Sequence, residues 1–116
     1  MEYVLKKMNQ KDIILMPYPF TDLKERKVRP ALIISNDKFN NSQDDVIAVP
    51  LTTIIKDVPY SLLIGQKDLI SGDLIKPSRI RADKIFSVEK KLIITKVGTI
   101  DNKTFEKVKS ELLKLL

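Results

Sequence analysis

An apolar run between turn-forming residues, Pro30-Ala31-Leu32-Ile33-Ile34-Ser35-Asn36-Asp37, shows the pattern that decides the fold of this chain. Short runs of this kind, bounded by Pro, Asn, Asp or Gly, are typical of β-strands. They recur through the first hundred residues, at 13–18, 31–35, 46–52, 60–64, 78–86 and 92–97. Several runs are too continuous for strands with one solvent-facing side. We therefore expect strands that face a core on both sides or that close into a small barrel.

The pattern changes after Gly98, where apolar residues return at helical spacing. Four of them fall on one face of a helix: Phe105, Val108, Leu112 and Leu115. Asp101 or Asn102 can cap its first turn, and the spacing predicts a helix of about fourteen residues. The polar stretches 36–37 and 40–45 predict turns between strands. The sequence therefore predicts one mostly β domain over residues 1–116, with a C-terminal helix packed on it.

Composition narrows the possible functions. The chain has 116 residues of which 43% are hydrophobic, enough for one modest core. It contains no cysteine and no histidine, which excludes disulfides and thiolate metal sites and removes the commonest general base. These absences leave no thiolate and no imidazole ligand for a metal ion. No apolar run reaches the length of a signal peptide core or a membrane span, so we expect a cytoplasmic protein without a membrane partner.

The positive charge is concentrated in two segments, 24–30 and 76–84. Each has a net charge of +3, and together they account for the net charge of +6. They also hold all four arginines of the chain, whereas the seventeen lysines are scattered. The basic side chains of the two segments are Lys24, Arg26, Lys27, Arg29, Lys76, Arg79, Arg81 and Lys84. Because a guanidinium presents a planar fork that matches two phosphate oxygens, this placement indicates phosphate recognition by a polyanion-binding protein.

Residues 78–83 contain a carboxylate within this basic surface. If 78–86 is one strand, alternation puts Arg79, Arg81 and Asp83 on the same face. The pattern leaves two interpretations open: Asp83 pairs with Arg81 on an ordinary exposed sheet face, or the three side chains form a phosphate site. Segment 24–29 is similarly open between a solvated hairpin tip and a binding loop.

Four segments of the chain, in this order, resemble the MazF/PemK family of toxins from toxin–antitoxin modules: DIILMPYPFTD at 12–22, VRPALIISND at 28–37, AVPLTT at 48–53 and IRADKI at 80–85. With the C-terminal helix, the resemblance runs from about Lys11 to the end of the chain. It implies an SH3-like barrel that forms a homodimer and binds a cognate antitoxin protein. It also implies an endoribonuclease that cuts single-stranded RNA, often messenger RNA, at short sequence motifs and so inhibits growth. The RNA's own 2′-OH attacks, leaving a 2′,3′-cyclic phosphate and a 5′-OH, with no cofactor.

The resemblance also implies the site. Carried over by position, the catalytic residues are Arg29, Thr52, Arg81 and Asp83, the last two as acid and base. The residues expected to bind RNA are Tyr18, Lys24, Arg26, Lys27, Thr53, Lys76, Ser78, Arg79 and Lys84, with Tyr18 available to stack on a base. Lys11 stands where the family usually has glycine, which we interpret as local turn chemistry. The 24–28 loop lacks the histidine of some members, which leaves Asp83 as the only obvious base.

Two other functions remain open at this level. One is a non-catalytic barrel that holds nucleic acid or a partner protein through the same basic segments. The other is a toxin directed at a topoisomerase, as in the related CcdB-type proteins. The combination of Arg29 with Thr52, Arg81 and Asp83 favours the RNA-cleaving function, because electrostatic binding alone needs no carboxylate in a basic patch.

Overall fold

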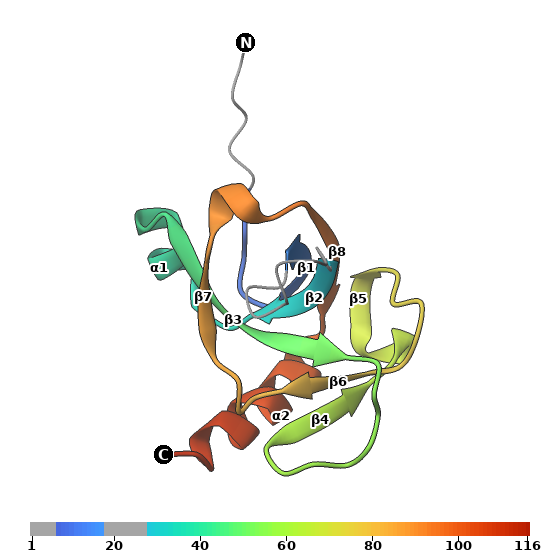
Figure 1. Cartoon of the computed structure of the whole chain (residues 1–116). Helices are drawn as coiled ribbons and strands as arrows, with labels where there is room; N and C mark the ends of the chain where they lie inside the picture. Colours follow the sequence, from blue (N-terminus) through green and yellow to red (C-terminus); the bar gives the residue numbers. More distant parts are fainter. Residues whose placement is uncertain (1–6, 18–27) are drawn as a thin grey trace, which may run out of the picture.

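The computed structural model describes residues 7–17 and 28–116. Within these ranges eight strands form one strongly curled sheet, with the C-terminal helix packed against it (Figure 1). The strands are β1 (Asp12–Pro17), β2 (Val28–Ile33), β3 (Asp45–Thr52), β4 (Ser61–Ile64), β5 (Leu69–Gly72), β6 (Ser78–Arg81), β7 (Phe86–Glu89) and β8 (Thr95–Ile100). The helices are α1 (Asp37–Ser42) and α2 (Asn102–Leu113), with short 3-10 turns at Gln66–Asp68 and Lys90–Leu92. The expectation of a mostly β chain with a C-terminal helix is confirmed.

All strand pairs are antiparallel, in the order β4-β6-β3-β2-β1-β8-β5. Strand β3 lies at the centre and is shared between two partners along one edge. Its first half pairs with β7, from Asp45 to Ala48, and its end pairs with β6, at Leu51 and Thr52. The sheet therefore curls around β3, and the carboxyl end of β3 lies between β2 and β6.

Both faces of β1, β2 and β3 are buried, each against its own hydrophobic cluster. One cluster consists of Met8, Ile14, Met16, Ala31, Ile33, Val46, Ala48, Val88 and Ile93. The other consists of Ile13, Leu32, Val49, Leu51, Ile64, Ile80, Ile100, Phe105 and Val108, the last two from α2. Because neighbouring residues along each strand enter different clusters, the apolar runs in the sequence are continuous. This confirms the expectation of strands that face a core on both sides.

Helix α2 begins where the sequence indicated. The Asp101 side chain caps it by accepting a hydrogen bond from the Thr104 backbone N–H at 2.7 Å. The hydrogen bonds from Thr104 lower the pKa of the Asp101 carboxyl. The helix runs for 12 residues, somewhat shorter than expected. Phe105 and Val108 are buried and Leu112 packs against the same cluster, whereas Leu115 lies beyond the helix end.

The expected turns at 36–37 and 40–45 are wrong in part, because residues 37–42 form α1. The Asn36 side chain accepts a hydrogen bond from the Phe39 backbone N–H at 2.8 Å and so caps this helix. Asn40 is buried and donates to the Ser35 carbonyl at 2.9 Å. Strand β5 was also not predicted, since its sequence, LISG, is too short to show alternation.

The expected strand 78–86 is wrong as a single strand. Strand β6 ends at Arg81, and β7 begins only at Phe86. Between them the Lys84 N–H donates to the Arg81 carbonyl at 3.2 Å, which closes a turn. The Ala82 N–H donates to the Tyr60 carbonyl at 3.0 Å and holds the start of this turn. Asp83 therefore lies in a turn, and strand alternation does not place it.

The start of β1 is held by a buried carboxylate. Asp12, 1% exposed, accepts hydrogen bonds from the Asn9 N–H at 3.0 Å and the Thr99 hydroxyl at 2.8 Å, and pairs with Lys96 at 3.3 Å. Lys11, just before it, has a φ of 81°, in the left-handed region that favours glycine. The departure from glycine at this position is thus a matter of local turn geometry. No helix in the described ranges has both the length and the apolar character needed to cross a bilayer.

Candidate functional site

The candidate site lies where one face of the sheet changes from apolar to basic residues. Ala31 of β2, a member of the first cluster, faces Pro50 of β3. Continuing this register by two residues brings Arg29 opposite Thr52, since every second residue of a strand shares a face. On the other edge of β3, Thr52 is paired with Arg79 of β6. The carboxyl end of β3 is therefore flanked by an arginine-bearing strand on each side.

A pocket of about 270 Å³ opens at this place. Its lining residues are Arg29, Pro50, Leu51, Thr52, Ile54, Lys56, Val58, Arg81 and Lys84. The described lining thus combines an apolar wall with four cationic side chains and contains no carboxylate. Such a pocket suits a phosphodiester beside a flat apolar group, because the cations attract the phosphate and the wall contacts the remainder of the ligand. Three of the four predicted catalytic residues, Arg29, Thr52 and Arg81, are brought together here.

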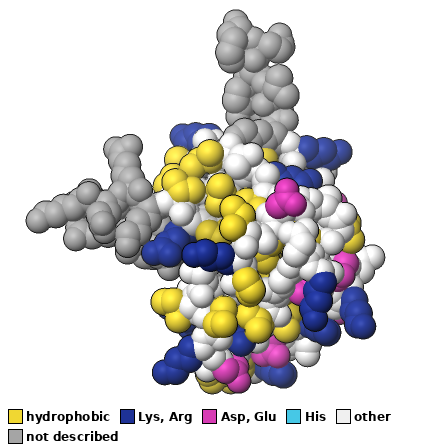
Figure 2. All heavy atoms as spheres, turned by 90° about the vertical axis from the view of Figure 1, so that its right-hand side faces the viewer, with side chains coloured by type: hydrophobic (Ala, Val, Ile, Leu, Met, Phe, Trp, Pro, Cys, Tyr) yellow, Lys and Arg dark blue, Asp and Glu magenta, His cyan; other side chains and the backbone are white. Residues whose placement is uncertain are grey.

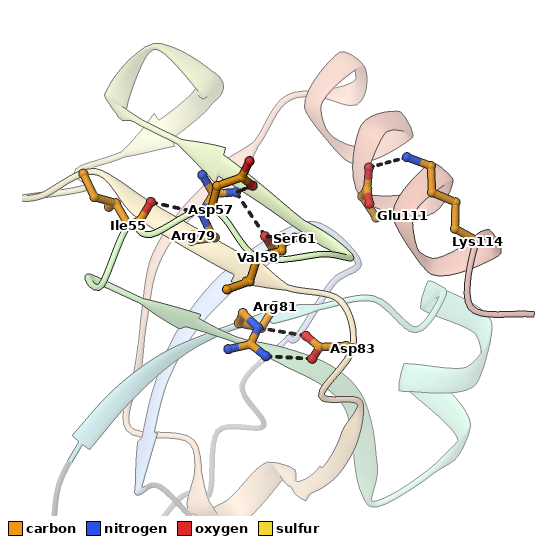
Figure 3. A network of polar contacts seen from close by, with 9 residues as sticks. All are labelled: Ile55, Asp57, Val58, Ser61, Arg79, Arg81, Asp83, Glu111 and Lys114. Carbon is orange, nitrogen blue, oxygen red and sulfur yellow. Dashed lines mark hydrogen bonds and ion pairs between the residues drawn. The ribbon is translucent and has the colours of Figure 1, made fainter.

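The fourth, Asp83, is bound to Arg81 side by side (Figure 3). Arg81 donates from Nε to Oδ1 at 2.8 Å and from Nη2 to Oδ2 at 2.7 Å, a bidentate pair. Both side chains are about a quarter exposed. The hydrogen bonds from Arg81 hold the pKa of the Asp83 carboxyl below its ordinary value, so Asp83 is ionised at neutral pH. The pairing orients the guanidinium of Arg81, which lines the pocket.

The hydroxyl of Thr52 is oriented by the backbone. Its Oγ1 accepts a hydrogen bond from the Ile54 N–H at 3.1 Å. A threonine hydroxyl has one hydrogen to donate, and the acceptor role is here taken up by the chain itself. The hydroxyl hydrogen of Thr52 can therefore be donated to an anion in the pocket.

The remaining predicted RNA-binding residues are distributed unevenly. Lys84 lines the pocket, and Thr53 and Lys76 are exposed but do not line it. Ser78 and Arg79 are buried, at 2% and 8% exposure. Tyr18, Lys24, Arg26 and Lys27 lie outside the residues that the structure describes. The structure thus joins the two basic segments through Arg29 and Arg81.

The sequence interpretation missed the loop between β3 and β4. Ile54, Lys56 and Val58 of this loop line the pocket, although the loop contains no arginine and no motif. No local sequence signal distinguishes these three residues from those of an ordinary exposed loop. In Figure 1 the arrowhead of β3 points to the side that Figure 2 turns toward the viewer. There hydrophobic side chains gather at the surface with lysine and arginine side chains beside them.

Within residues 7–17 and 28–116, no three or more Asp and Glu side chains are grouped so that they could hold a metal ion. The cationic side chains of the pocket are the groups available there to stabilise negative charge.

Comparison with known proteins supplies an independent line of evidence. A family described as "PemK-like, MazF-like toxin of type II toxin-antitoxin system" matches residues 9–116. Endoribonuclease MazF4 of Mycobacterium tuberculosis is 30% identical over 84 residues, which cover 72% of this chain and 74% of the relative. Endoribonuclease MazF1 of Mycobacterium bovis matches to the same extent.

Solved structures show the same fold. An endoribonuclease in complex with its cognate antitoxin, from a mycobacterial species, superposes with a TM-score of 0.74 at 23% identity over 92% of both chains. A MazE–MazF complex from Deinococcus radiodurans gives 0.75 at 19% identity, over 95% of this chain and 96% of that one. At these identities the likeness establishes the fold, which confirms the expected small, SH3-like, mostly β barrel with a C-terminal helix.

Proposed function

Because the chain belongs to the family of PemK-like, MazF-like toxins of type II toxin–antitoxin systems, we propose that it is an endoribonuclease toxin that cuts single-stranded RNA. The observation that carries the proposal is the convergence of Arg29, Thr52 and Arg81 in one pocket, with Asp83 bound to Arg81. These residues come from three different strands and the turn that follows one of them, and a fold alone does not require any of them. Their convergence supports chemistry on a phosphodiester.

The proposed roles follow from the needs of in-line attack by a 2′-OH. A bond forms between phosphorus and O2′, and the bond to O5′ breaks, so negative charge builds on the non-bridging oxygens. Arg29 and Arg81 stabilise this charge, and the Thr52 hydroxyl donates a further hydrogen bond to the same phosphate. The departing O5′ takes a proton from water. Arg81 acts by electrostatic stabilisation, because an arginine stays protonated in proteins.

Asp83 is the proposed acceptor of the 2′-OH proton. Each of its oxygens accepts one hydrogen bond from Arg81 and retains a second lone pair for another. Its lowered pKa ensures that it is ionised but makes it a weak base. Asp83 therefore has two proposed contributions, as the proton acceptor and as the group that orients Arg81.

We also propose how the toxin contacts the rest of the RNA, where it acts, and with which partners it assembles. The lysines Lys56 and Lys84 at the pocket hold neighbouring phosphates of the RNA. The chain acts as a single domain over 1–116, in the cytoplasm, as a homodimer, and an acidic segment of a cognate antitoxin covers the same basic pocket. Relatives solved in complex with an antitoxin support the expectation of an antitoxin partner.

The test is incubation of the purified protein with a long RNA in the presence of a chelator. We expect fragments that carry 2′,3′-cyclic phosphate and 5′-OH ends. The variants Arg29→Ala and Arg81→Ala are expected to stay folded and to produce no fragments. Salt-sensitive RNA binding without any fragments from the wild-type protein would instead support the non-catalytic binding module.

A further inference from the structure

Arg79 is a cation that the proposed mechanism does not use. The sequence placed it among the RNA-binding residues, but its side chain is only 10% exposed and it does not line the pocket. Its guanidinium is instead directed at the β3–β4 loop (Figure 3). Nη1 donates to the Ser61 hydroxyl at 3.0 Å, Nε donates to the Ile55 carbonyl at 3.4 Å, and Nη1 lies 3.5 Å from the Asp57 carboxylate. A buried charge of this kind needs such partners to offset its lost hydration.

The loop that Arg79 contacts is the same loop that forms one wall of the pocket. Residues 53–60 carry no helix or strand and are largely exposed. Along this loop Ile54, Lys56 and Val58 line the pocket. The two residues between them, Ile55 and Asp57, supply the carbonyl and the carboxylate that face Arg79. Alternate positions of the loop therefore face the pocket and the buried arginine.

The contacts of Ser61 extend this connection. Ser61 accepts a hydrogen bond from Arg79 and donates one to the Val58 carbonyl at 2.5 Å. The end of the loop is also fixed to the Arg81–Lys84 turn, because the Tyr60 carbonyl accepts from the Ala82 N–H at 3.0 Å. The loop is thus held both at its centre, through Arg79, and beside the Arg81–Asp83 pair.

We infer that Arg79 is a positioning residue that fixes the β3–β4 loop as the wall of the pocket and thereby sets which nucleotide fits beside the scissile phosphate. This inference rests on the proposed RNA cleavage. The planar fork of an arginine reaches several acceptors in fixed directions at once, whereas a lysine presents a point charge on a flexible stem. The inferred role of Arg79 therefore depends on the geometry of its guanidinium more than on electrostatic attraction of the RNA.

The competing role is direct contact of Arg79 with a phosphate, and the two roles respond differently to salt. A lost phosphate contact lowers the slope of log K against log salt concentration by about 0.7 for a single strand. A lost loop contact loosens residues 53–60, and any change in the slope then comes from Lys56 of the same loop. A probe that cannot be cleaved, a single-stranded oligonucleotide of 2′-deoxynucleotides with mixed sequence, allows the slope to be measured on all variants.

The experiment compares the full-length wild type with Arg79→Lys, Arg79→Met and, from the loop side, Asp57→Asn. Lys67→Gln, which removes one exposed charge from a 3-10 turn, is the matched control. Three quantities are measured: hydrogen exchange of segment 53–60, the salt slope with the deoxy probe, and the relative rates at different cleavage sites of one long RNA.

We expect faster exchange in 53–60 for both Arg79 variants, with a smaller change of the same sign for Asp57→Asn and none for Lys67→Gln. Any fall in the salt slope is accompanied by this faster exchange, because Lys56 lies in the same loop. For Arg79→Met, kcat/KM falls by about 10- to 100-fold, as misplacement of a site by about 1 Å can cause. The ratio of rates between cleavage sites changes for both Arg79 variants.

Unchanged exchange in 53–60 together with a salt slope reduced by about 0.7 in Arg79→Met would overturn the inference in favour of a phosphate contact. Unchanged cleavage-site ratios in both Arg79→Lys and Arg79→Met would overturn it as well. If the wild type cuts no RNA, the proposed function fails, and the exchange and salt measurements still decide whether Arg79 holds the loop.

Discussion

Replacing Arg81 with alanine removes a guanidinium that lines the pocket and leaves the Asp83 carboxylate without its bidentate partner. A single preorganised donor at a site of developing charge is worth about 2.7–4 kcal/mol, or about 10²- to 10³-fold in rate. The same pair is about a quarter exposed, so after solvent screening it contributes under about 1 kcal/mol to folding. We therefore expect Arg81→Ala to lose activity far out of proportion to stability.

A double-mutant cycle distinguishes the two proposed roles of Asp83, orienting Arg81 and accepting the 2′-OH proton. If Asp83 contributes mainly by orienting Arg81, Arg81→Ala combined with Asp83→Ala is no worse than Arg81→Ala alone, because the two side chains act as one unit. If Asp83 also accepts the 2′-OH proton, the double variant cleaves more slowly than Arg81→Ala alone, because the carboxylate that takes the proton is lost as well.

The assay is single-turnover cleavage of an end-labelled RNA by each variant, with urea unfolding to measure stability. Lys109→Ala, which breaks an exposed pair with Glu106 on α2, is the control expected to cleave like the wild type. Cleavage near the wild-type rate by Arg81→Ala would refute the role of Arg81. If the fold-loss of cleavage rate in the double variant equals the product of the two single losses, the view that Arg81 and Asp83 act as a unit is refuted.

Three further predictions concern the fold and pH. Lys11→Gly should have a free energy of unfolding about 1 kcal/mol higher than Lys11→Ala, because both lose the Lys11 contacts and only glycine relieves the left-handed φ of 81°; equal stabilities in urea would contradict this. Asp12→Ala should lower the free energy of unfolding by about 1–3 kcal/mol, since it leaves buried donors unpaired. The rate of RNA cleavage per folded molecule should stay unchanged, and a reduced rate would mean that Asp12 contributes to the site. Arg81 lowers the pKa of Asp83 below 3.8. The contribution of this pair to stability is therefore complete above pH 3.8 and is lost as the pH falls through the lowered pKa. Urea titrations of wild type and Asp83→Asn at several pH values check this, and a difference in their free energies of unfolding that disappears already at pH 5 would contradict it.

Much of the fold could be read from the sequence where local and tertiary preferences agree. The run at 46–52 corresponds to nearly all of β3, the run at 31–35 covers the second half of β2, and α2 begins at its predicted cap, Asp101. The errors in the predicted secondary structure lie where tertiary contacts determine the conformation of the backbone. Residues 37–42 are polar and short, and α1 is held by the Asn36 cap and by buried Asn40. The break after Arg81 depends on the Tyr60 carbonyl from another strand connection.

The candidate site shows the same division. The confinement of every arginine to two segments indicated where phosphate binds, and the resemblance then selected Arg29, Thr52, Arg81 and Asp83. Alternation on a strand was the wrong reason for the proximity of Asp83 to Arg81, because a turn brings them together. Ile54, Lys56 and Val58 could not be selected at all, since nothing local distinguishes a pocket wall from an exposed loop.

The sequence by itself determined the class of partner and the layered β core, because charge distribution and apolar periodicity are properties of the chain before it folds. Only the tertiary structure decided what each arginine does. Arg79 and Arg81 are two residues apart on one strand, yet one is buried behind a loop and the other lines the pocket. The difference arises from the β3–β4 loop, which covers one guanidinium and leaves the other at the pocket, a long-range contact that no local pattern encodes.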